Sequence, residues 1–107
     1  MKRAARVDGN QLQIIGALTE AGAVVTSLAA VGKGVPDLLV SYRGKWSLLE
    51  VKDGSRPPSE RKLTEPQKRW QDKQRAATYV VTSPMEALEA IAAASRDGYR
   101  VAMREDA

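Results

Sequence analysis

Apolar and polar residues follow two different periods along this chain, and each period indicates one type of element. Between Asp8, a suitable N-cap, and Gly22, a suitable C-terminal stop, apolar residues recur at the spacing of a helix. Four short runs that are apolar or β-branched instead predict strands at residues 23–28, 37–42, 46–52 and 77–82. Two more helices are expected, at residues 64–75 and from the N-cap Ser83 onward.

The two ends of the chain fit this pattern less closely. The last helix is expected to end by Gly98, and the C-terminal tail, residues 98–107, is expected to form a short strand at 99–103 or to be loosely ordered. Residues 1–7 are expected to be a basic N-terminal tail. Residues 1–107 should form a single domain, because a chain of 107 residues can build one hydrophobic core.

The expected elements come in the order α-β-β-β-α-β-α. Arg43-Gly44-Lys45 is typical of a hairpin turn between antiparallel neighbours, whereas the last strand follows a helix and needs a crossover connection. The sequence therefore predicts an α/β fold with a single mixed β-sheet flanked by helices.

The composition excludes several kinds of chemistry. The chain has no cysteine and no histidine, which rules out disulfides, cysteine-based zinc sites and histidine-dependent catalysis, and leaves oxygen ligands for hard cations such as Mg²⁺. No apolar run approaches the ~20 residues of a membrane span, and the basic N-terminus lacks the apolar region of a signal peptide. We therefore expect a soluble, cytoplasmic protein without a membrane partner.

The surplus of positive charge is concentrated in one stretch. The net charge is +4, and residues 52–75 alone account for it. Such a basic stretch favours a polyanionic partner, although a solvated helix face with mixed charges would look the same. The candidate contacts to a nucleic-acid backbone are Lys33, Arg56, Arg61, Lys62, Lys68 and Arg69.

Three charged residues near the hairpin are the candidate catalytic groups. Glu50 and Lys52 share one face of a strand because side chains alternate, and the hairpin can bring Asp37 beside them. Two carboxylates suit Mg²⁺, the carbonyl of Val51 could be a further ligand, and Lys52, expected to stay protonated, could stabilise charge on a phosphodiester.

Each of these residues also has a structural interpretation. Asp37 could simply begin a strand after Pro36, and Glu50 and Lys52 could form the polar face of an edge strand. The functional interpretation is favoured, because both charges interrupt a run that otherwise resembles a buried strand.

Gln67 and Trp70 are two further candidates on the expected second helix. Gln67 lies three residues after Thr64, which matches a capping box, so its side chain could cap the helix or could face the metal site. Trp70 is expected in the core rather than on the surface as a platform for base stacking.

The motifs GVPDLLV, LLEVK and LTEPQKRW together resemble the PD-(D/E)XK nuclease superfamily, and within it the VRR-NUC group of stand-alone phage proteins and repair nucleases. The resemblance covers about residues 8–91 and implies a restriction-endonuclease-like core. Asp37 fits the motif aspartate, Glu50 and Lys52 fit the E-x-K pair, and Gln67 fits the glutamine on the following helix.

The resemblance also implies an activity and partners. It implies a Mg²⁺- or Mn²⁺-dependent endonuclease that cuts DNA, often branched, flap or splayed, acts as a homodimer and works in a bacterial host cell if phage-encoded. One feature departs from the group: the first helix lacks the glutamate that often helps to bind metal, and Asp8 or Asn10 is the nearest substitute.

Two other functions stay open at this point. The chain could be a non-catalytic nucleic-acid-binding module that keeps the fold and serves a phage packaging or repair assembly. A basic protein-interaction domain without a nucleic-acid role is supported only by composition.

Overall fold

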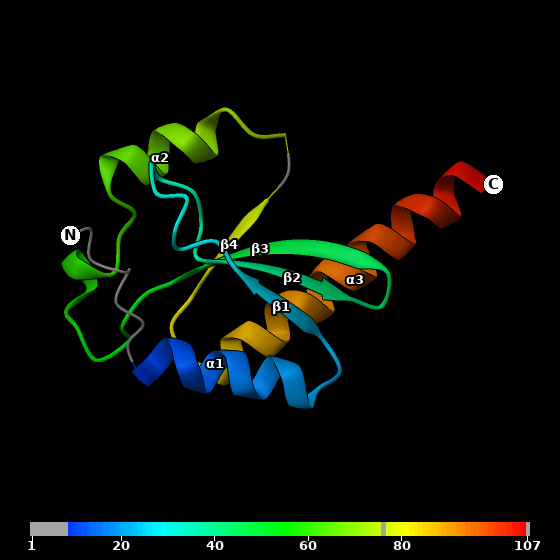
Figure 1. Ribbon diagram of the computed structural model, residues 1–107. Helices are drawn as coiled ribbons and strands as arrows, with labels where there is room; N and C mark the ends of the chain where they lie inside the picture. The colour runs from blue at the N-terminus through cyan, green and yellow to red at the C-terminus, as the bar shows by residue number, and fades with distance from the viewer. Residues whose placement is uncertain (1–8, 76, 107) are drawn as a thin grey trace.

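The computed structural model describes residues 9–75 and 77–106, with side chains up to residue 96 (Figure 1). Its elements follow the order α1 (Gly9–Glu20), β1 (Val24–Ser27), β2 (Leu38–Tyr42), β3 (Lys45–Val51), a short 3₁₀ helix (Pro58–Glu60), α2 (Glu65–Asp72), β4 (Thr78–Val81) and α3 (Pro84–Asp106). The predicted α/β fold and the order α-β-β-β-α-β-α are therefore confirmed. None of the described helices is long and apolar enough to cross a membrane.

The four strands form one mixed sheet in the order β1-β2-β3-β4. β1, β2 and β3 are antiparallel neighbours, and β4 joins β3 in parallel after the crossover through α2. The hairpin between β2 and β3 turns at Arg43 and Gly44, which both have positive φ, and its register pairs Leu38 with Leu49. This topology is the single mixed sheet that the turn and the crossover predicted.

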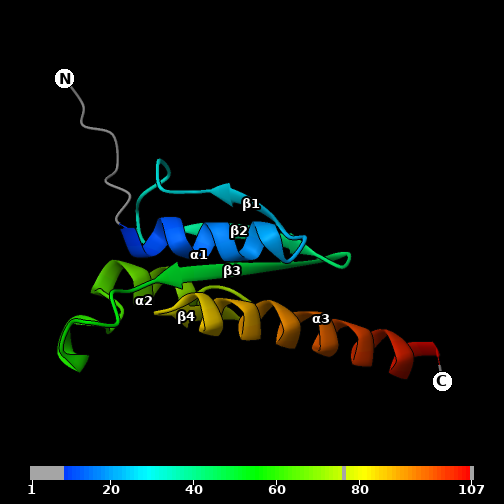
Figure 2. The same cartoon turned by 90° about the horizontal axis from the view of Figure 1, so that it is seen from below.

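One face of the sheet carries the core. Alternate strand residues on this face pack beneath α1 and α3, which lie on the same side of the sheet in both views (Figures 1 and 2). The buried cluster consists of Ile14, Leu18, Ala23, Leu38, Val40, Leu49, Val81, Ala87, Ala90 and Ile91. α2 lies on the opposite side of the sheet, near the end of β3 (Figure 1). We call this second face of the sheet the open face, because α1 and α3 do not cover it and α2 lies only near the end of β3 (Figures 1 and 2).

The C-terminal prediction was wrong. α3 does not end by Gly98 but continues to Asp106, so the expected strand or loose tail at residues 98–107 is a helix as far as it is described. A single glycine costs a helix only about 1 kcal/mol, and no proline follows it to end the helix.

The expected core position of Trp70 was also wrong, and two predictions near the N-terminus fall on residues that the structure does not describe. Trp70 is half-buried and is not a member of the core cluster, because α2 lies away from the face that α1 and α3 cover. Asp8 as N-cap or metal ligand and the basic tail at residues 1–7 lie outside the described residues.

Candidate active site

The register of the hairpin places Asp37 beside Glu50. Leu38 is paired with Leu49, so the next position along brings Asp37, immediately before β2, opposite Glu50 near the end of β3. Directly opposed residues in a sheet point to the same face, and here that face is the open one. Two carboxylates that are distant in sequence thus become neighbours.

Glu50 is an acid in an unfavourable environment. Only 4% of its surface is exposed. Burial, the negative charge of Asp37 and a hydrogen bond shared with Asp37 raise the pKa of the Glu50 carboxyl from 4.5 to about 7, although Lys52 acts in the opposite direction. The ammonium of Lys52 therefore compensates only part of the cost of holding two carboxyls in this buried place.

Gln67 joins Glu50 to Lys52. Its Nε2 donates a hydrogen bond to Oε2 of Glu50 at 2.9 Å, and its Oε1 accepts one from Nζ of Lys52 at 2.9 Å. Nζ of Lys52 also lies 3.5 Å from Oε2 of Glu50, and its side chain is mostly buried. The ammonium is thus held at a fixed place beside the carboxylates.

The same Gln67 also caps its own helix. Its Oε1 accepts a hydrogen bond from the backbone N–H of Thr64 at 2.8 Å, and Oγ1 of Thr64 accepts one from the N–H of Gln67 at 3.4 Å. This is the capping box that the sequence predicted. The two interpretations of Gln67 are therefore compatible, because one side chain makes both sets of contacts.

The oxygen atoms around Asp37 are suitable ligands for one hard cation. Oδ2 of Asp37 accepts a hydrogen bond from the N–H of Val51 at 2.8 Å. The N–H of Lys52 donates to Val81 on the β4 side, and backbone groups alternate along a strand, so the carbonyl of Val51 points to the side of Asp37. Within the described part of the chain, no group of three or more acidic or histidine side chains gathers. Mg²⁺ commonly takes only one or two carboxylates and keeps several waters, so this set suffices for one ion.

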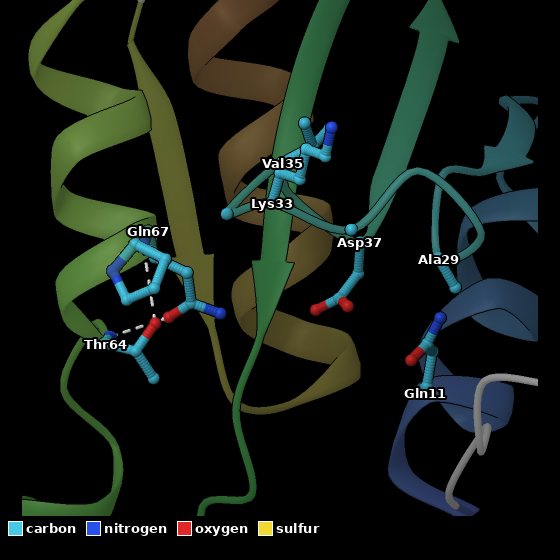
Figure 3. Close-up of a pocket in the computed structure, with 10 residues that line it drawn as sticks. Gln11, Ala29, Lys33, Val35, Asp37, Thr64 and Gln67 are labelled. Carbon is cyan, nitrogen blue, oxygen red and sulfur yellow. Dashed lines mark hydrogen bonds between the residues drawn. The ribbon is translucent and has the colours of Figure 1, made fainter.

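A cavity of about 390 Å³ opens beside the cluster, between the loop that precedes β2 and the start of α2 (Figure 3). Its lining includes Asp37, Gln67, Thr64, Gln11 and Lys33. The loop reaches this position through three successive residues with positive φ, namely Gly32, Lys33 and Gly34. Of the two carboxylates, Asp37 lines the cavity, whereas Glu50 is buried behind it and is reached through its contact with Gln67.

Gly34 is required for the approach of this loop to α2. A Cβ at residue 34 would overlap the carbonyl oxygen of Pro66, whereas a Cβ at Gly32 would meet nothing within 4 Å. Both residues have positive φ, so both alanine variants carry the same backbone strain of about 1–2 kcal/mol. We expect Gly34→Ala to lower the free energy of unfolding by about 2 kcal/mol more than Gly32→Ala, measured by urea denaturation. Equal losses would show that the close approach to Pro66 is unimportant.

On α1, the side chain of Asn10 serves the backbone. Its Nδ2 donates to the carbonyls of Lys52 at 2.9 Å and Thr82 at 3.2 Å, so it holds the ends of β3 and β4 together. Asn10 therefore supports the position of Lys52 through the main chain.

Gln11 is the site residue that the sequence analysis missed. It is 6% exposed and lines the cavity, across from Asp37 and next to Ala29 (Figure 3). Its position relative to Ile14 and Leu18 could have identified it, because a polar residue three and seven positions before core residues lies on the buried stripe of the helix.

The candidate DNA-contact residues are not equivalent. Lys33 is exposed and lines the cavity. Arg61 is half-buried, and its Nε is buried without a hydrogen-bond partner among the described residues. Exposed ion pairs join Arg56 to Asp53 and Glu60 and join Lys68 to Glu65. Lys62 and Arg69 are exposed. Most of these cations can therefore reach a polyanion, whereas Arg61 is less accessible than the others.

Comparison of the chain with protein-family models, with curated proteins and with solved structures found no match.

Proposed function

We propose that this protein is a divalent-metal-dependent DNA endonuclease that hydrolyses phosphodiester bonds, with selectivity for branched, flap or splayed DNA. The observation that carries the proposal is the cluster of Asp37, Glu50, Lys52 and Gln67, in which two carboxylates, one buried, lie beside an ammonium held by an amide. We also propose membership of the PD-(D/E)XK superfamily, which the order of the elements and the positions of these four residues support.

Asp37, Glu50 and the carbonyl of Val51 would hold Mg²⁺ or Mn²⁺. Oδ2 of Asp37 accepts a hydrogen bond from the N–H of Val51, and Oε2 of Glu50 contacts Gln67 and Lys52, while the two carboxyls also contact each other, so a bound ion would take the place of the proton between them. A bound ion would supply Lewis-acid polarisation of the scissile phosphate. It would also supply positive charge to the Glu50 carboxylate, whose pKa is raised first by burial and then by the negative charge of Asp37.

Lys52 would stabilise the negative charge that develops on the phosphate. Because Gln67 and Glu50 fix its Nζ before substrate arrives, little reorganisation is needed during the reaction. Gln67 would act as the positioning residue for this ammonium.

The exposed cations, led by Lys33 at the cavity, would contact the DNA backbone without reading its sequence. A DNA substrate would place the protein in the cytoplasm, and the homodimer that the resemblance implies is part of the same proposal.

The test is cleavage of flap, splayed, four-way and plain duplex DNA of equal length with Mg²⁺, Mn²⁺ or EDTA. We expect cuts that need the metal and that fall mainly on the branched substrates. If the protein binds these DNAs but cuts none with either metal, the non-catalytic module is the better description. If it binds no DNA even at low salt, both nucleic-acid functions are wrong.

The two roles of Gln67 can be separated with Thr64. Thr64→Ala and Gln67→Ala each remove cap hydrogen bonds, so each should lower the free energy of unfolding by about 1 kcal/mol. We expect only Gln67→Ala to reduce the cleavage rate, by at least about tenfold, because only Gln67 contacts Glu50 and Lys52. Equal losses of cleavage in the two variants would assign Gln67 to helix capping alone.

A further inference from the structure

The open face of the sheet is unusually apolar for a surface exposed to solvent. Trp46 is 70% exposed and Val24 is 66% exposed, and both are paired with Ser41 of the central strand β2. The next row pairs Leu39 with Leu48, and both are half-buried. A sheet with one wet face normally carries polar residues on that face, and an exposed apolar patch of this kind marks a binding surface.

This surface is continuous with the candidate active site. Trp46, Leu48 and Glu50 alternate along β3, so they point to the same face. Trp46 lies four residues from Glu50, which corresponds to about 13 Å along the strand. A polymer whose reacting phosphate lies at the carboxylates can extend over this face, because α1 and α3 occupy the other one (Figure 2).

The charges around the surface favour a nucleic-acid strand with unpaired bases. Apart from Asp37 and Glu50 at the candidate active site, the described open-face positions of the strands carry no acid, and the hairpin at their far end carries Arg43 and Lys45. The exterior of a duplex presents phosphates and would need cations along the whole surface. An uncharged floor with an exposed tryptophan instead suits bases, which stack on aromatic rings regardless of their identity.

We propose that a single-stranded segment of the substrate lies along the open face, with one base stacked on Trp46. This inference rests on the proposed nuclease function for the location of the reacting phosphate, and it assigns to Trp46 a binding role that favours substrates with unpaired bases beside the cut.

The binding test avoids cleavage by using EDTA. The affinity of the full chain for a single-stranded oligothymidylate and for a duplex of equal length is measured by fluorescence anisotropy of a labelled DNA. We expect Trp46→Ala to weaken single-strand binding by about tenfold or more, and Trp46→Tyr to retain most of it, with little change for the duplex. Met85→Ala is the matched control, because Met85 is equally exposed, at 70%, and lies at the start of α3.

The stacking itself can be observed in a Trp70→Phe background, where Trp46 is the remaining tryptophan of the chain. We expect oligothymidylate to quench its fluorescence. Unchanged single-strand affinity in Trp46→Ala, or absence of quenching, would overturn the inference.

A second copy of the chain on this face would give a different result. Trp46→Ala would then convert a dimeric wild type into a monomer, and this loss of the dimer would contradict the strand-binding inference. A dimer that persists in Trp46→Ala would be formed through another surface and would agree with the inference. Failure of the nuclease proposal is distinguishable: if no metal supports cleavage but Trp46→Ala still weakens single-strand binding selectively, the binding surface stands without the enzyme.

Discussion

Lys52→Ala is expected to reduce the rate of DNA cleavage by about 10²–10³-fold while leaving DNA binding nearly unchanged. Nζ of Lys52 lies 2.9 Å from Oε1 of Gln67 and 3.5 Å from Oε2 of Glu50, so the variant removes a positioned charge from the centre of the cluster. The loss should appear in kcat with little change in KM, because the interaction is made with charge that develops in the transition state. The measurement is single-turnover cleavage of the preferred branched DNA with saturating Mg²⁺.

A matched control for Lys52 is Lys68→Ala. Lys68 is exposed on α2 and pairs with Glu65 at 3.7 Å, so its removal changes the net charge equally without touching the cluster. We expect Lys68→Ala to weaken DNA binding modestly at low salt and to leave kcat unchanged. Equal cleavage by the wild type and Lys52→Ala would indicate a contaminating nuclease or a catalytic centre elsewhere.

Glu50→Gln is expected to stop cleavage and to stabilise the metal-free protein above pH 7. The folded protein holds the proton of Glu50 up to about pH 7, whereas the unfolded chain releases it near pH 4.5. The unfolded state therefore binds fewer protons between these values, and the free energy of unfolding of the wild type should fall as the pH rises through this window. At 1.36 kcal/mol per pH unit, this contribution amounts to about 3 kcal/mol.

Urea denaturation in EDTA at pH 5, 6, 7 and 8 measures this effect. The glutamine keeps the size of the side chain but cannot ionise, so the fall in stability should be much smaller in Glu50→Gln than in the wild type. Glu89→Gln, on an exposed position of α3, is the control and should follow the wild type. Parallel pH profiles for the wild type and Glu50→Gln would show that the carboxyl of Glu50 is not destabilised.

Metal should reverse the destabilisation only in the wild type. Binding of a divalent ion to Asp37 and Glu50 replaces the proton and favours the folded state. We therefore expect Mg²⁺ or Mn²⁺ to raise the stability of the wild type at pH 8 and to have a smaller effect on Glu50→Gln. In that case the carboxyls that bind the metal lower the free energy of unfolding of the metal-free protein.

Local sequence patterns predicted most of the fold. The strand at β3 was readable as an apolar run, although the sequence did not mark its two faces, because the polar Ser47 is buried and the apolar Leu48 is on the open face. The capping box at Thr64 was equally readable, since it depends on residues three apart. The error at Gly98 arose because one glycine is a weak stop when no proline follows it.

The contacts of the site depend on residues distant in sequence. Glu50 and Lys52 were assigned to one face by alternation alone, but Gln67 lies on a separate helix, and spacing could not decide whether its side chain capped that helix or reached Glu50. Gln11 was overlooked although its spacing from Ile14 and Leu18 places it on the buried stripe of α1, and only the packing of α1 on the sheet decided that it lines the cavity beside Asp37.

The sequence by itself determined the element order, the hairpin turn and the residue types available for chemistry, because each depends on local propensity or on composition. Only the tertiary structure decided that Asp37 is opposite Glu50, that Gln67 links Glu50 to Lys52, and that Trp46 is exposed on the same face. The physical reason is that register, crossover and helix packing fix these distances, and each is the outcome of the whole core rather than of neighbouring residues.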